Sequence, residues 1–374
     1  MVKRMKILHC ADLHLDSRMS TNLNTELRKK RKAEILNTYQ RMIEYAVKEK
    51  IEAILIAGDL FDTNAVSRTA MSAVFNSIVK NPGIQFYYLK GNHDVRSFLA
   101  SMEEVPTNLH LFSDTWKSYV LCAGAHRNIV LTGVELHAEN SSLIYPSLSL
   151  DSRDFNIVTL HGQNAVYQAK DKTEVISISD LKNKGIDYLA LGHVHGYTKE
   201  ALDARGTYCY PGCLEGRGFD ECGEHGFVVL DVDEETGCYT HSFVPFAYRT
   251  LYTVPVDVSG CLNSDEMIDC VQQRLQKETY APESLLKIEL VGDVDVSCEK
   301  NLSYIQDRFA SRFFFVKVKD KTRWKTDYKQ YLLNESLKGE FVRVVMEDDK
   351  LSEDEKNEII RCGLQALAGE ELTE

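Results

Sequence analysis

Short apolar runs and longer segments with helical spacing alternate through the first two thirds of the chain. The runs have the length of buried strands, and each is followed by a glycine or a polar residue. They cover residues 5–11, 53–57, 85–89, 155–160 and 188–191. Apolar residues also recur at three- and four-residue intervals over residues 33–47 and 70–79, which predicts two helices. Residues 227–232 and 240–244 predict a closing hairpin.

The pattern changes after residue 246, where strands and helices alternate again in a shorter segment. We predict strands at 250–258, 285–291 and 313–319, with helices at 264–277 and 304–312. From about residue 328 the chain is predicted to be helical, and Ser352 with Glu355 forms a capping-box pattern. The sequence thus predicts an α/β domain of residues 1–245, a small α+β cap domain of residues 246–327 and a helical tail of residues 328–374.

The tail carries apolar residues that fall on one face of each of two predicted helices. They are Leu332, Leu337, Phe341 and Val345 on the first, and Ile359, Ile360, Leu364 and Leu367 on the second. Residues 335–374 also hold 12 acidic and 5 basic residues. We interpret this acidic, amphipathic tail as a docking surface for a partner, or else as a stripe that packs on the cap domain.

Composition narrows the class of protein. Hydrophobic residues make up 44% and charged residues 27% of the chain, as in globular proteins. No apolar run approaches the ~18 residues of a membrane span. The net charge of −12 argues against nonspecific coating of nucleic acid. The ten cysteines include no C-x-x-C pair and no secretion signal precedes them, so we expect reduced thiols and a cytoplasmic protein without a membrane.

Five predicted strands in succession end in residues that commonly bind metals. In an open α/β sheet the carboxyl ends of the strands converge on one crevice. The residues with nitrogen or oxygen ligands are Asp12, His14, Asp59, Asn92, His161, His193 and His195. This set suits Mn, Fe or Zn and is too large for one tetrahedral ion. Two ions roughly 3.5–4 Å apart are the usual device for attack on a phosphorus ester. A single histidine would more simply be a core or surface residue, but five such signals in order favour a metal site.

The ordered motifs D-x-H, G-D-x-x-D, G-N-H-D, a strand-end histidine and G-H-x-H resemble the calcineurin-like metallophosphoesterase signature over about residues 5–245. The resemblance implies a two-layer β-sandwich flanked by helices, with two divalent metal ions, most simply Mn, at the strand ends. It implies that one metal is held by Asp12, His14, Asp59 and His195, and the other by Asp59, Asn92, His161 and His193. Asp59 would bridge the ions, and a hydroxide activated by both would be the nucleophile. His93 would be the catalytic residue that contacts the scissile phosphate, as general acid or electrostatic stabiliser.

Within that superfamily, residues 8–15 and 210–217 are similar to SbcD-type DNA repair exonuclease subunits. This resemblance implies a Mn-dependent exonuclease that acts on DNA, forms a homodimer and works with a coiled-coil ATPase subunit of the SbcC type. The alternatives are a small-molecule phosphodiesterase or phosphatase of the same superfamily, and a non-catalytic scaffold. The extra residues 246–374 favour the nuclease, because a small-molecule enzyme does not need them.

Three further features have two interpretations each. Asp62 and Asp94 follow ligand residues and would orient the imidazoles, or cap helices. The cation run 28–32 would contact phosphates, or would be a solvated helix start. Trp324, in the basic stretch 317–325, would stack on a base, or pack in the core.

Overall fold

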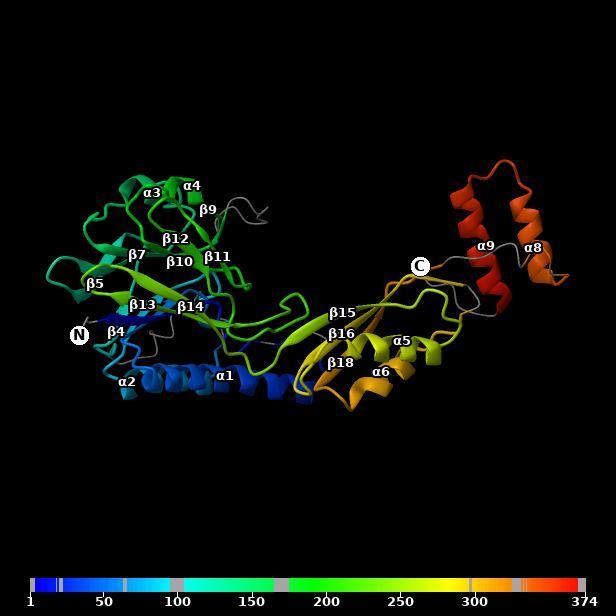
Figure 1. The fold of residues 1–374 in the computed structure, drawn as a ribbon, viewed down its shortest axis with the longest axis horizontal. Coiled ribbons are helices and arrows are strands. Elements are labelled where there is room, and N and C mark those ends of the chain that lie inside the picture. The colour runs from blue at the N-terminus through cyan, green and yellow to red at the C-terminus, as the bar shows by residue number, and fades with distance from the viewer. Residues whose placement is uncertain are drawn as a thin grey trace. The chain divides into compact units, whose positions relative to one another are not determined.

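The computed structural model describes residues 4–17, 19, 23–62, 66–94, 104–164, 175–295, 298–324, 331, 333 and 335–368. The chain divides into two compact units, Met1–Thr250 and Leu251–Glu374 (Figure 1). Among the described residues, no helix has both the length and the apolar character that crossing a membrane requires.

The first unit contains a six-stranded sheet in the order β14-β13-β1-β2-β3-β4. Its strands are β1 (Arg4–Cys10), β2 (Ala53–Ala57), β3 (Gln85–Leu89), β4 (Leu109–Leu111), β13 (Gly226–Asp233) and β14 (Tyr239–Pro245). The first four run parallel, β13 is antiparallel to β1, and β14 is antiparallel to β13. The predicted closing hairpin is therefore present, and its first strand extends the sheet beside β1.

A second six-stranded sheet has the order β11-β12-β10-β7-β6-β5. It consists of β5 (Lys117–Ala123), β6 (Asn128–Gly133), β7 (Phe155–His161), β10 (Tyr188–Gly192), β11 (Thr198–Ala201) and β12 (Thr207–Tyr210). The four central strands are parallel, whereas the edge strands β5 and β11 are antiparallel to their neighbours. A short parallel pair, β8 (Gln163–Asn164) and β9 (Val175–Ile176), follows β7 in the chain.

Alternate residues of both sheets pack against each other. Ile7 and Leu55 of the first sheet share one buried cluster with Leu131 and Ile157 of the second. The other face of the second sheet packs on α3 (Ile144–Ser147) and α4 (Ile178–Leu181). Figure 1 shows α1 (Thr25–Lys48) and α2 (Arg68–Lys80) along the first sheet. The predicted two-layer sandwich flanked by helices is confirmed.

The second unit begins with a three-stranded parallel sheet in the order β15-β16-β18. Its elements are β15 (Leu251–Asp257), α5 (Ser264–Gln276), β16 (Leu285–Val291), α6 (Leu302–Ala310) and β18 (Phe315–Asp320). A short parallel pair, β17 (Asp293–Val294) and β19 (Arg323–Trp324), accompanies it. The order of elements is the predicted α+β pattern. The expected boundary at residues 327 and 328 lies outside the described residues.

Two helices, α8 (Leu337–Met346) and α9 (Glu353–Ala368), form the described part of the tail. Val342 and Val345 of α8 pack against Ile360 and Leu364 of α9. The predicted capping box is present, because the Ser352 N–H donates to Glu355 and the Glu355 N–H donates to the Ser352 hydroxyl.

The predicted apolar stripe is thus divided between two environments. Val345, Ile360 and Leu364 are buried within the hairpin, whereas Leu337, Ile359 and Leu367 are exposed. Phe341 is partly buried against the hairpin core, and Leu332 lies outside the described residues. Trp324 packs against the same hairpin core and the core of the three-stranded sheet, which agrees with the packing interpretation.

Both interpretations of the cation run were wrong for Arg31. The helix begins at Thr25, earlier than predicted, with the Asn24 side chain as its cap. Arg31 is fully buried, and its guanidinium donates to Glu34, to Glu215 and to the Gly216 carbonyl. Arg31 therefore belongs to an internal ion network instead of facing solvent or DNA.

Candidate metal centre

The carboxyl ends of parallel strands in both sheets bring the predicted ligands together. Four of the seven ligand residues have positive φ angles: Asp12 at 52°, His14 at 42°, Asp59 at 52° and His193 at 98°. Non-glycine residues in this region are strained by roughly 1–3 kcal/mol each, and such strain concentrates at functional sites. The backbone is held there by hydrogen bonds from Asp12 N–H to the Gly58 carbonyl and from His14 N–H to the Asp59 carbonyl.

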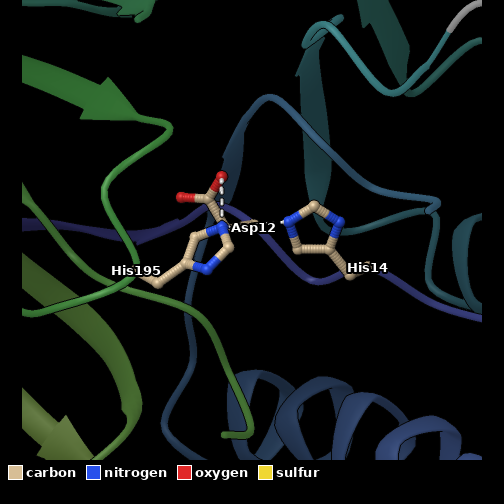
Figure 2. Close-up of side chains that lie close together, drawn as sticks. All are labelled: Asp12, His14 and His195. Atoms are coloured by element: carbon tan, nitrogen blue, oxygen red, sulfur yellow. Dashed lines mark hydrogen bonds and ion pairs between the residues drawn. The ribbon is translucent and has the colours of Figure 1, made fainter. Parts of the chain in front are cut away.

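One cluster contains Asp12 and His14, from the segment after β1, and His195, from the loop after β10 (Figure 2). The two Nε2 atoms of His14 and His195 are 3.2 Å apart, and His195 Nε2 lies 4.0 Å from Asp12 Oδ1. Two nitrogens bound ~2.1 Å from one ion are separated by ~3.0–3.4 Å. The cluster therefore has the spacing of ligands around one metal ion.

The ring orientation of these histidines supports the same conclusion. His14 Nδ1 lies 3.0 Å from Asp62, and His195 Nδ1 lies 2.7 Å from Glu221. A proton on each Nδ1, facing a carboxylate, leaves a lone pair on each Nε2. Two lone pairs facing each other at 3.2 Å repel unless a cation lies between them. The donor atoms present therefore fit a bound metal ion.

A second cluster contains Asp12, Asp59 and His161. His161 Nε2 lies 3.0 Å from Asn92 Oδ1 and 3.4 Å from Asp59 Oδ2. The same Asp59 Oδ2 lies 3.8 Å from His14 Nε2, while Asp59 Oδ1 accepts the His93 N–H. One oxygen of Asp59 is thus turned toward both clusters, which is the position a bridging carboxylate requires.

His193 completes the predicted set beside the second cluster. Its ring is edge-on to that of His161, with the ring centroids 5.4 Å apart. Its backbone N–H donates to both carboxylate oxygens of Asp12. The structure thus brings all seven predicted ligand residues to one edge of the two sheets.

The charges at this edge are strongly coupled. Burial opposes ionisation of Asp59, but His161 and His14 outweigh it and hold the pKa of Asp59 well below its usual range. Burial also lowers the pKa of His161, but the Asp59 carboxylate outweighs it and raises that pKa to about 9. Burial, with His161, lowers the pKa of His193 to about 4. The buried carboxylates therefore attract positive charge, and His193 keeps a neutral imidazole able to bind metal.

Two glycines make room for these side chains. A Cβ atom at Gly58 would lie 2.0 Å from the His161 ring, and one at Gly91 would lie 2.2 Å from Asp59 Oδ1. Any other residue at either position would displace a predicted ligand. The glycines of the G-D and G-N-H motifs are therefore required by the close approach of the ligand side chains.

His93 differs from the other histidines in its exposure. Its side chain is 45% exposed, against 4% for His161. Its Nδ1 lies 3.6 Å from Asp62 Oδ1, and its ring lies edge-on to that of His14. An imidazole that faces solvent beside the clusters is placed to contact a substrate.

The two aspartates that were expected to orient imidazoles have different environments. Asp62 lies between His14 and His93, as that role requires. Asp94 instead accepts backbone N–H groups of Leu60, Phe61 and Gly91. It thereby ties the loop after β3 to the loop after β2, because burial and three amide donors favour a structural anchor at this position.

Sequence reasoning missed two charged residues at the site, Glu221 and Arg217. Glu221 accepts from His195, and Arg217 donates to Glu221 and to Asp62. Both lie on an irregular loop, where no apolar periodicity marks a position. Only the similarity of residues 210–217 to a known subgroup pointed toward Arg217, and nothing pointed toward Glu221.

Comparison with known proteins identifies similar chains. Residues 5–197 match the family described as calcineurin-like phosphoesterase. The metallophosphoesterase YhaO of Bacillus subtilis is 28% identical over 74% of this chain and 69% of its own length. The DNA double-strand break repair protein Mre11 of Sulfolobus acidocaldarius is 24% identical over 90% and 91%. A subunit of the nuclease SbcCD of Staphylococcus epidermidis is 25% identical over 77% and 81%.

Proposed function

The chain belongs to the calcineurin-like phosphoesterase family, and from this premise we propose that it is a metal-dependent phosphodiesterase that cleaves DNA as an SbcD-type exonuclease subunit. The observation that supports the chemistry most directly is the Asp59 oxygen that faces both ligand clusters. A shared carboxylate is the arrangement that two ions need for a concerted displacement at phosphorus.

The ligand sets follow from the two clusters. Asp12, His14, Asp59 and His195 would hold one ion, and Asp59, Asn92, His161 and His193 the other. Two divalent cations, in our proposal Mn, supply the positive charge that activates a water nucleophile and neutralises the phosphate oxygens. Imidazole, carboxylate and amide oxygen together suit Mn, with Fe or Zn as alternatives.

His93 is proposed as the catalytic residue. Its exposed ring would donate a proton from Nε2 to the leaving oxygen, or stabilise the charge that develops there. The Asp62 carboxylate beside Nδ1 would hold the ring in this orientation and stabilise its protonated form. General acid catalysis of this kind contributes about 10²–10⁴-fold to the rate.

Two observations support DNA as the substrate. The Mre11 and SbcCD similarities extend over 90% and 77% of this chain, well beyond the 193 residues that match the phosphoesterase family. A cavity of about 590 Å³, lined by Lys90, Asn92, His137 and His161 among others, opens beside the second cluster. It has room for a terminal nucleotide, which an exonuclease must accommodate.

The same relatives support a multisubunit assembly. We propose that the exposed residues Leu337, Val344 and Leu367 of the helical hairpin dock a coiled-coil ATPase subunit, and that the chain forms a homodimer. All ten cysteines are free thiols, in keeping with a cytoplasmic location. Deleting residues 328–374 should abolish capture of the ATPase subunit while Mn²⁺-dependent cleavage of a small phosphodiester persists. Loss of that cleavage together with the fold would mean that the tail is part of the core.

Hydrolysis of bis(p-nitrophenyl) phosphate tests the phosphodiesterase chemistry. The parent should be active with Mn²⁺ and inactive with a chelator. His93→Gln should keep both metals but lose about 10²-fold in turnover, whereas the control His110→Gln, which alters a histidine paired with Gln85, should match the parent. If His93→Gln also lost an ion, His93 would be a ligand and the proposed assignment would be wrong.

A further inference from the structure

We propose that Glu221 and Arg217 are positioning residues that fix the rings of His195 and His14 at the distance needed to hold one metal ion. This inference rests on the proposed metal-binding function and assigns to it two residues outside the ligand set. Both lie on the loop that follows β12, between residues 211 and 225.

Glu221 determines which ring nitrogen of His195 is free. Its Oε1 lies 2.7 Å from His195 Nδ1, and an Arg217 nitrogen lies 3.3 Å from the same Nδ1. A guanidinium only donates, and Nδ1 cannot accept from it while donating to Glu221. The shorter contact to a carboxylate places the proton on Nδ1. The Nε2 lone pair then faces His14 and Asp12, where the ion would be bound.

Arg217 connects this contact to the equivalent contact at His14. Its Nη1 lies 3.1 Å from Asp62 Oδ1, and its Nη2 lies 2.9 Å from Glu221 Oε1. Asp62 in turn lies 3.0 Å from His14 Nδ1. Because the guanidinium is a rigid planar fork, it fixes the separation of the two carboxylates, and they fix the two rings. The chain His14–Asp62–Arg217–Glu221–His195 thus closes an arch around the metal position.

The loop that carries this arch is itself held in place. The Cys213 N–H donates to the His195 carbonyl at 3.0 Å. Gly212 has a φ of +77°, and a Cβ atom there would lie 2.6 Å from the same carbonyl oxygen. Arg31, fully buried, donates to the Gly216 carbonyl at 2.9 Å. These contacts fix the backbone on both sides of Arg217.

The surroundings of Arg217 favour positioning over direct binding of phosphate. Its side chain is only 18% exposed, and two carboxylates share its charge. Its own backbone N–H also donates to Glu221 at 2.7 Å. Hydrogen bonds to the ionised form hold the pKa of Glu221 well below its usual range, although burial opposes this. A guanidinium compensated in this way offers little net positive charge to a substrate.

Calorimetric titration of the full chain with Mn²⁺ tests the proposal. The parent should bind two ions. Arg217→Met and Glu221→Leu should weaken one binding step by about 10–100-fold and leave the other unchanged, as removal of partners outside the ligand set does elsewhere. Glu221→Gln should weaken it less than Glu221→Leu, because the amide oxygen still accepts the Nδ1 proton. The control Arg205→Met removes a partly exposed arginine paired with Asp187 and should bind both ions like the parent.

Steady-state kinetics with bis(p-nitrophenyl) phosphate at saturating Mn²⁺ separate positioning from substrate contact. For Arg217→Met we expect a lower kcat with KM within twofold of the parent. Unchanged Mn²⁺ affinity, or a KM raised tenfold with both ions bound, would overturn the proposal. If Arg217→Met fails to fold, equal affinities of Glu221→Gln and Glu221→Leu would overturn it. A parent chain that binds no Mn²⁺ would refute the proposed function instead.

Discussion

The buried ion network around Arg31 gives the sharpest prediction about stability. Arg31 of α1 donates to Glu34 and Glu215, and Arg249 donates to Glu34 through two nitrogens. Two arginines therefore balance two glutamates, and Thr38 also donates to Glu215. Arg31→Met keeps a side chain of similar length and apolar packing but removes one of the two positive charges.

The expected cost follows from what is left behind. Glu215 is 2% exposed and would keep hydrogen-bond donors but lose its charged partner. Removing one member of a buried ion pair costs about 3–5 kcal/mol, because the remaining charge stays uncompensated. This loss is a large share of the ~5–15 kcal/mol by which domains are stable. The double variant Arg31→Met, Glu215→Gln should recover much of it, since no unpaired charge is then buried.

Urea unfolding monitored by tryptophan fluorescence measures this loss. The chain has two tryptophans, so a Trp324→Phe background leaves Trp116 as the reporter of the first unit. At a slope of ~2–3 kcal/mol per molar urea, Arg31→Met should lower the midpoint by ~1–2 M. The control Lys29→Met, an exposed cation of the same run, should shift it little. Equal midpoints for Arg31→Met and Lys29→Met would refute the buried-network argument.

Three other outcomes are expected. Asp59→Asn should lose one of the two bound Mn²⁺ ions and all but about a tenth of the activity; metal analysis that still finds two ions would exclude a bridging role. Gly363→Ala should reduce hydrogen-exchange protection of α8 and α9, costing ~1–3 kcal/mol, because its Cβ atom would lie 2.1 Å from the Phe341 ring; Gly83→Ala, with no atom within 4 Å, is the control. Burial, with His241, lowers the pKa of His9 to about 3, so the unfolded chain binds the extra proton as the pH falls below 6.5. Between pH 7 and 5 the parent should therefore lose about 2 kcal/mol more unfolding free energy than His9→Gln, and parallel pH dependences would contradict this.

The central strands and the ligand edge could be predicted because each depends on local pattern. Fully buried strands such as β2 and β3 appear as continuous apolar runs, and the predicted bounds of both agree with the structure. The ends of parallel strands then converge by geometry alone. Residues as distant in sequence as Asp12 and His195 could therefore be placed together without any contact information.

The remaining features depend on contacts that no local pattern records. The edge strand β5 was missed because most of its side chains are at least partly exposed, so it lacks an apolar run. The start of α1 was placed too late because its first turns are rich in cations, one of which pairs with Glu215 far along the chain. Glu221 was missed for a similar reason, since its role follows from a contact with His195 that only the folded loop creates.

Digestion of end-labelled linear duplex DNA by the full chain tests the central claim most directly. With Mn²⁺ the parent should release label progressively from the ends, a chelator should stop the reaction, and Asp59→Asn should be inactive. Release of label that persists in the chelator or in Asp59→Asn would contradict two-metal catalysis at this site. Intact DNA alongside Mn²⁺-dependent hydrolysis of small phosphodiesters would contradict the proposed substrate.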